Sequence, residues 1–179
     1  MDSEQRLIRQ ARDNPEHFRE LYRAYFPKVY AYVAYHVAYA NDAEDVVSEV
    51  FLKAMKGIGQ FRGESFAAWL FGIARNAIST FYRRNGHAPL DALADELHAD
   101  TPTPDVLVMQ AETREEMLRL IGTLSPRRQE VITLKFFGGL RNQEIAEVLG
   151  LDERSVASHL CRALRDLHER YERQMADDR

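Results

Sequence analysis

Apolar side chains recur every three or four residues along most of this 179-residue chain. Such spacing places apolar residues on one face of an α-helix. No stretch shows the strict alternation of apolar and polar residues that is typical of a half-buried strand. The hydrophobic fraction of 45% and the charged fraction of 29% are ordinary for a folded globular chain. The sequence therefore predicts an all-α protein.

The first half of the chain is predicted to form a bundle of four helices. Their approximate ranges are 18–26, 28–39, 42–56 and 65–85. Pro27 separates the first two, because proline in a helix interior removes a hydrogen bond and clashes with the preceding turn. The third helix is expected to bury an apolar stripe, which is Val46, Val47, Val50, Phe51, Ala54 and Met55.

The helical pattern fades in the middle of the chain, where prolines and acidic residues alternate. Pro89, Pro102 and Pro104 lie there, and residues 87–124 carry eight acidic and two basic side chains. Prolines together with like charges oppose a packed helix, so residues 87–111 are predicted to be a flexible acidic linker, with a short helical turn near 91–97. The net charge of −4 therefore comes from one stretch, and it does not argue against DNA binding by the rest.

The C-terminal part has the pattern of a helix-turn-helix. Helices are predicted near 111–124 and 127–137, with Ser125-Pro126 starting the second. Two further helices, the last beginning near residue 152, are joined by Leu149-Gly150-Leu151, and Asp152 is placed to cap the last one. Its inward stripe is Val156, Leu160, Ala163, Leu164 and Leu167, and its outward residues are Arg154, Ser155, Ser158, His159, Arg162 and Arg165. An ordinary helical hairpin with a solvated polar face is the alternative interpretation.

Several classes of protein are disfavoured by what the sequence lacks. No charge-free run approaches the length needed to cross a bilayer, and the polar N-terminus has no secretory signal. Cys161 is the single cysteine, so a reducing cytoplasm is the expected location, without membrane insertion. No metal-binding, phosphate-loop or nucleophile motif is present. The chain is therefore predicted not to be an enzyme and to have no cofactor or metal.

Four sequence segments resemble conserved parts of bacterial sigma factors. Residues 124–131 (LSPRRQEV) and 143–150 (QEIAEVLG) resemble the fourth conserved domain, residues 42–54 (DAEDVVSEVFLKA) resemble the core-binding helix of domain 2, and residues 61–76 resemble the promoter-melting part of domain 2. Their order, with no third domain between them, resembles the extracytoplasmic-function (ECF) type. The resemblance implies two small helical domains, residues 1–86 and 112–179, joined by the linker 87–111.

The resemblance also implies the partners and the surfaces that bind them. These partners are core RNA polymerase, promoter DNA and an anti-sigma factor. The residues implied to dock on the clamp helices of the polymerase are Asp42, Asp45, Glu49 and Lys53. The helix 127–137 is either a surface for the polymerase flap or internal core through Val131, Leu134 and Phe137.

Promoter contacts are expected in two places. Residues 61–86 are locally basic and rich in aromatic side chains, which can hold phosphates and receive unstacked bases. Loop residues Phe61 to Phe66 are favoured for contact with the exposed non-template strand of the DNA, whereas Trp69 and Phe81 are expected in the protein core. The residues assigned to the −10 element are Phe61, Arg62, Ser65, Phe66, Arg75, Asn76, Tyr82, Arg83 and Arg84. Those assigned to the −35 element are Arg154, Ser155, Ser158, His159 and Arg162.

Three functions are compatible with these patterns. The first is an ECF-type sigma factor that binds core polymerase, directs it to −35 and −10 elements and assists melting. The second is a stand-alone helix-turn-helix regulator with an N-terminal sensor or dimerisation bundle, which would have no reason to carry the segments 42–54 and 61–76. The third is an antagonist or decoy that keeps the fold without promoter contacts.

Overall fold

The computed structural model of the chain describes residues 3–37, 39–85 and 108–177, and within them every regular element is helical. The all-α prediction is confirmed. The elements are α1 (Ser3–Asp13), η1 (Pro15–His17), α2 (Phe18–His36), α3 (Ala40–Gly57), η2 (Ile58–Gln60), α4 (Phe66–Arg84), α5 (Val108–Gly122), α6 (Pro126–Phe136), α7 (Asn142–Leu149) and α8 (Glu153–Asp177). The predicted turn near 91–97 lies outside the described residues, and α5 begins three residues before the predicted end of the linker.

The prediction of two helices separated by Pro27 is wrong, because α2 runs through this proline without a break. Its buried stripe continues on both sides of Pro27 and consists of Phe18, Leu21, Tyr25, Val29, Tyr32, Val33 and His36. Proline in a helix interior costs about 3 kcal/mol, and burial of this stripe is large enough to offset it. Tertiary packing therefore overrides the local signal.

Helix α1 was not predicted from the sequence. Its composition is mostly charged and polar, and its buried residues are Ile8 and Ala11. Asn14 accepts a hydrogen bond from the backbone N–H of Glu16, at 2.9 Å, and starts the short turn that leads into α2. The helix packs against α2 and η2, so the bundle of the first half is made of α1, α2, α3 and α4.

Helices α3 and α4 form the rest of this bundle. The stripe predicted for α3 is buried from Val46 to Ala54, but Met55 is exposed, because the helix has turned its last apolar residue toward solvent. Helix α4 is preceded by its N-cap residue Ser65, whose hydroxyl oxygen accepts from the N–H of Ala68 at 3.1 Å. This is the bond expected of an N-cap serine.

Helices α5 to α8 make up the second half. The α7–α8 turn has Gly150 in the left-handed conformation, with φ of 63°, and Leu151 N–H donates to the Ala146 carbonyl at 2.9 Å. Asp152 accepts from Ser155 N–H at 2.8 Å, so its predicted capping role is confirmed. The inward stripe of α8 is confirmed except at Leu164, which is exposed because it lies one residue beyond the buried 156–160–163–167 line.

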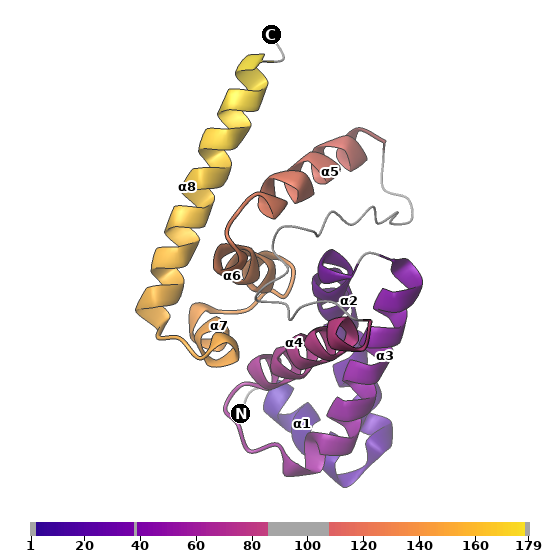
Figure 1. The fold of residues 1–179 in the computed structure, drawn as a ribbon. Helices are drawn as coiled ribbons and strands as arrows, with labels where there is room; N and C mark the ends of the chain where they lie inside the picture. The colour runs from indigo at the N-terminus through magenta and orange to yellow at the C-terminus, as the bar shows by residue number, and fades with distance from the viewer. Residues whose placement is uncertain (1–2, 38, 86–107, 178–179) are drawn as a thin grey trace.

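The two halves share one hydrophobic core within the described residues. In Figure 1, α8 stands along one side, α1 to α4 form the bundle at the other, and α6 and α7 lie between them. Helix α7 packs against α4 and helix α6 packs against α2. At this contact, a Cβ added to Gly138 would lie 2.9 Å from the Phe71 ring and 2.7 Å from the Leu134 carbonyl, so the chain approaches too closely for any larger residue.

Candidate functional site

The outer face of α3 carries the acidic residues predicted to dock on polymerase. Asp45 is exposed, whereas Asp42 and Glu49 are half-buried, and the apolar stripe lies on the opposite face. Glu49 binds Lys53 at 2.6 Å on the same helix and lies 3.7 Å from Arg84 of α4. Asp45 therefore presents the more accessible carboxylate, and Glu49 belongs to a charged cluster that joins α3 to the end of α4.

Two apolar side chains on α3 were missed as surface residues. Leu52 is 52% exposed and Met55 is 39% exposed, and they lie about one turn apart on α3. Protein interfaces are commonly anchored by apolar side chains surrounded by charged ones. The signal in the sequence is the spacing, since Met55 lies at the edge of the buried stripe of α3 and Leu52 lies outside it.

The segment before α4 brings together most of the predicted loop residues. Phe61 and Phe66 are buried and pack with Trp69, at ring-centroid distances between 5.1 and 5.9 Å. The guanidinium of Arg62 is exposed and donates to the carbonyls of Gly59 and Phe61, at 2.8 and 2.9 Å. A base could reach Arg62 here, but stacking on Phe61 or Phe66 would require these rings to leave their packing.

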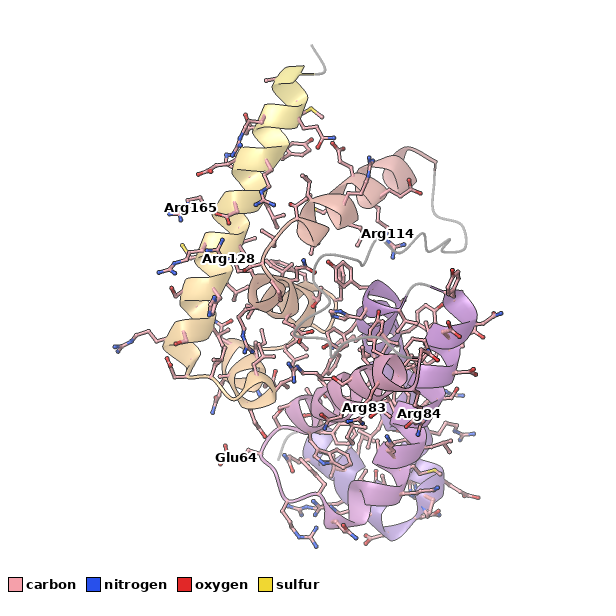
Figure 2. The ribbon with its side chains drawn as sticks, in the orientation of Figure 1. Glu64, Arg83, Arg84, Arg114, Arg128 and Arg165 are labelled. Atoms are coloured by element: carbon pink, nitrogen blue, oxygen red, sulfur yellow. The ribbon has the colours of Figure 1, made fainter. Side chains whose placement is uncertain are left out.

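Helix α4 presents the other residues predicted for the −10 element. Asn76, Arg83 and Arg84 are exposed, and Figure 2 shows the last two side by side at the end of α4. The Tyr82 hydroxyl is buried and donates to the His36 carbonyl; burial raises the pKa of Tyr82 to about 12. Arg75 is half-buried and its Nε lies 3.3 Å from Glu130 of α6.

A line of polar contacts joins the two halves, and we call it the seam. Its contacts are Arg75 to Glu130 at 3.3 Å, Ser65 to Glu144 at 2.8 Å, Tyr35 to Gln129 at 3.2 Å, Tyr32 to Glu130 at 3.3 Å and His36 to Thr133 at 3.4 Å. Two of the residues predicted to contact the −10 element, Ser65 and Arg75, therefore make their contacts within the protein. No sequence pattern indicated these pairs.

Electrostatics at the seam depend on burial. His36 lies 3.5 Å from Glu130, but burial, followed by the positive charge of Arg75, lowers the pKa of His36 to about 3. The ring is therefore uncharged at neutral pH, and its contact with Glu130 is not an ion pair. Burial opposes ionisation of Glu144, but hydrogen bonds from Arg141 and Ser65 outweigh it and hold the pKa of Glu144 below its usual value.

The outer face of α8 carries the residues predicted for the −35 element. Arg154, Ser158 and Arg162 are exposed, and Figure 2 shows Arg165 pointing away from the body of the molecule. The Ser155 hydroxyl is engaged, because it donates to Asp152 at 2.6 Å. A recognition helix needs exposed donors on one face, and these arginines supply them.

His159 lies near a group of arginines, two of which come from α6 and were not predicted as part of this surface. Burial, followed by the charges of Arg127, Arg128 and Arg162, holds the pKa of His159 below its usual value. Arg128 also pairs with Asp166 of α8. Arg127 therefore extends the basic surface of α8 onto the start of α6, and the signal for it was the Arg pair after Ser125-Pro126.

Helix α6 resolves the alternatives stated for its apolar residues. Val131 and Leu134 are fully buried, and Phe137 packs against Tyr35 of α2 at a centroid distance of 5.6 Å. Val131 and Leu134 therefore belong to the core, and Phe137 is half-buried against it. Phe136 is 59% exposed and is the apolar residue that α6 leaves available to a partner.

Neither a metal site nor a membrane-spanning helix is found in the described part of the chain. Residues 3–37, 39–85 and 108–177 contain no cluster of three or more potential metal ligands. Among the helices of the same residues, none combines the length and the apolar character that crossing a membrane requires.

Comparison with known proteins identifies both halves. Residues 21–88 match the family described as Sigma-70 region 2, and residues 114–167 match Sigma-70, region 4. The chain is 31% identical over 157 residues to the ECF RNA polymerase sigma-E factor of Escherichia coli, covering 82% of each chain. It is 34% identical over 154 residues to the ECF RNA polymerase sigma factor BldN of Streptomyces coelicolor, covering 84% of this chain and 58% of BldN.

The fold is also that of a solved structure, CnrH in complex with the cytosolic domain of CnrY. The TM-score is 0.73 at 24% identity, covering 96% of this chain and 98% of CnrH. The two matched regions define a sigma-70 type initiation factor. More particularly, the chain belongs to the ECF RNA polymerase sigma factors, which direct transcription initiation and are not enzymes themselves. The stand-alone regulator is therefore no longer a competing interpretation.

Proposed function

We propose that this chain binds core RNA polymerase through the outer face of α3, and promoter DNA through α4 and α8. The observation that carries the proposal is the combination, in one chain, of an acidic and apolar surface on α3 with an arginine-bearing outer face on the α7–α8 helix-turn-helix. The division into residues 1–86, 87–111 and 112–179, and a cytoplasmic location, are part of the same proposal.

Polymerase docking is assigned to Asp42, Asp45, Glu49 and Lys53, with Leu52 and Met55 as the apolar anchors beside them. Complementary charge favours encounter and orientation, whereas buried apolar anchors contribute most of the affinity. Phe136 of α6 is the candidate for a second contact with the polymerase, at the flap. An anti-sigma factor is proposed as a regulatory partner because family membership favours one.

Promoter contacts are assigned by exposure. Arg62, Asn76, Arg83 and Arg84 are accessible for the −10 element, and Arg154, Ser158 and Arg162 are accessible for the −35 element. Phe61, Ser65, Phe66, Arg75 and Tyr82 can contact DNA only after rearrangement, because they are buried or engaged at the seam. Ser155 and His159 are half-buried, and they border the exposed face of α8.

Run-off transcription tests the whole proposal. Core polymerase plus this chain is expected to start at a promoter selected from a genomic library, whereas neither component does so alone. A decoy would bind core without initiation, and that result would contradict the proposal.

Asp45→Arg with Glu49→Arg should weaken core binding by about tenfold or more, since like charges then face the partner.

The matched control for docking is Glu16→Arg with Glu20→Arg, which changes charge equally at exposed residues of η1 and α2. Equal loss of core binding in both double variants would remove the assignment to α3.

For the −35 element, Arg162→Ala should cost about 1–3 kcal/mol of binding at the preferred site, measured by holoenzyme titration on promoters with and without that element.

A further inference from the structure

Helix α1 precedes the residues that match Sigma-70 region 2, which start at residue 21. It nevertheless packs closely on the segment leading into α4. Ile8 and Ala11 are almost fully buried, and the helix contacts both α2 and η2. Its apolar contacts fix where its charged side chains lie relative to residues 58–66.

Arg12, near the end of α1, makes two contacts with one residue of that segment. Its Nη2 donates to the Phe61 carbonyl, and its guanidinium carbon lies 5.8 Å from the centroid of the Phe61 ring. A guanidinium can bind a carbonyl and an aromatic face together, because its donors lie in a flat fork. Arg12 therefore holds both the backbone and the side chain of Phe61.

Phe61 in turn determines the conformation of its neighbours. Its carbonyl also accepts from Arg62, at 2.9 Å, and its ring packs on Trp69 at 5.1 Å. A Cβ added to Gly63 would lie 2.8 Å from the same ring. The backbone from Gly59 to Gly63 thus folds around Phe61, and Arg62 points outward from it.

Helix α1 holds the same aromatic cluster at a second point. The Tyr25 hydroxyl donates to Glu4 of α1, and the Tyr25 ring packs edge-on against Phe66 at 5.3 Å. Phe66 completes the cluster with Phe61 and Trp69. Two charged residues of α1 therefore contact the cluster, one through Phe61 and the other through Tyr25.

We propose that Arg12 is a positioning residue for the −10-reading segment 59–66, acting through Phe61. This inference rests on the proposed function of that segment. A segment already held in its binding conformation loses less entropy on binding DNA, and it discriminates better between sequences because its donors have one fixed position. Arg12 itself does not touch the promoter.

The first measurement is the quenching of Trp69 fluorescence by acrylamide in the full chain. Trp69 is the only tryptophan, so the signal comes from one side chain, and this side chain packs on Phe61 and Phe66. Arg12→Ala should raise the quenching constant, and Arg12→Lys should raise it less, because lysine keeps a donor and a charge. Arg9→Ala, at an exposed arginine of the same helix, is the matched control and should leave quenching unchanged. Unchanged quenching in Arg12→Ala would overturn the inference.

The second measurement is promoter discrimination by holoenzyme. The ratio of initiation at a matched and a mismatched −10 element should fall by about tenfold in Arg12→Ala, the effect of losing one charged hydrogen bond. Core affinity and dependence on the −35 element should stay unchanged, which a general loss of stability would not allow. An unaltered ratio would overturn the inference even if quenching changed.

Gly63→Ala provides an independent route to the same state, because it displaces the Phe61 ring without altering α1. It should lower the ratio of initiation at the matched and the mismatched −10 element, as Arg12→Ala does. If circular dichroism shows that Arg12→Ala fails to fold, Gly63→Ala still tests whether displacing Phe61 reduces −10 discrimination. A wild-type holoenzyme that initiates without any −10 preference would contradict the proposed function instead. The quenching measurement would still decide whether Arg12 holds the segment.

Discussion

His36 is a titratable side chain enclosed by other polar and aromatic groups. Glu130 and Thr133 of α6 face it across the seam, the charge of Arg75 acts on it from α4 of the same half, and the rings of Tyr32 and Tyr35 pack against it from its own helix. Burial keeps its pKa far below the usual value, at about 3, so the native state holds the ring neutral. The unfolded chain binds a proton near pH 6.5, and this difference makes stability depend on pH.

The sign follows from which state binds the proton. Between pH 6.5 and 3 the unfolded state holds the proton and the native state does not, so stability falls as pH is lowered. We expect His36 to contribute a loss of about 2 kcal/mol in the free energy of unfolding between pH 7.5 and 5. Urea unfolding at several pH values measures it; His36→Gln should flatten the slope, and His17→Gln, at an exposed histidine, should keep it. Equal slopes in wild type and His36→Gln would contradict the assignment.

Among the elements, the helix-turn-helix was the one that local sequence signals predicted best. Gly150 and Asp152 each have a direct backbone role, so the turn and the start of α8 could be located from residue type alone. Helix α1 and the unbroken α2 could not, because their helical state depends on burial against other elements rather than on their own composition. Leu164 and Met55 were misplaced because periodicity gives a face only to within about one residue.

Two glycines on different elements should respond in opposite ways to the same substitution. Gly150 has φ of 63°, so Gly150→Ala should lower the free energy of unfolding by about 1 kcal/mol. Gly72 lies inside α4 with open space around an added Cβ, so Gly72→Ala should raise it by about 0.5–1 kcal/mol. Thermal unfolding of both variants compares them, and destabilisation by Gly72→Ala would contradict this account of α4.

At the scale of the whole molecule, the seam is the part of the candidate site that sequence could not predict. Its partners are far apart in the chain: Arg75 and Glu130 are 55 residues apart, and Tyr32 and Glu130 are 98 apart. Each of these residues also had an ordinary local interpretation, as a surface charge or a core aromatic. The two helical groups and several exposed arginines were predictable, whereas the contacts that engage Ser65 and Arg75 required the assembled core.

The Arg75–Glu130 contact should be coupled energetically across the seam. Glu130→Gln should lower the free energy of unfolding by about 2–3 kcal/mol, because it removes the buried negative charge that contacts the Arg75 guanidinium and the Tyr32 hydroxyl. A double-mutant cycle with Arg75→Met should give a coupling energy of about 1–3 kcal/mol. The control cycle uses the exposed Arg173–Glu169 pair of α8, for which about 0.5 kcal/mol is expected. Coupling as small as in the control would show that the seam pair contributes nothing specific.

Docking of Glu130 and Glu144 against α2 and α4 also sets a threshold for any partner that requires the two halves apart. Such a partner binds only the separated fraction of molecules, so its apparent dissociation constant is the intrinsic value divided by that fraction. Every 1.4 kcal/mol held in the seam then weakens apparent affinity about tenfold. Substitutions at Ser65, Tyr35 or Gln129, none of which needs to touch such a partner, would thereby change how tightly this chain binds it.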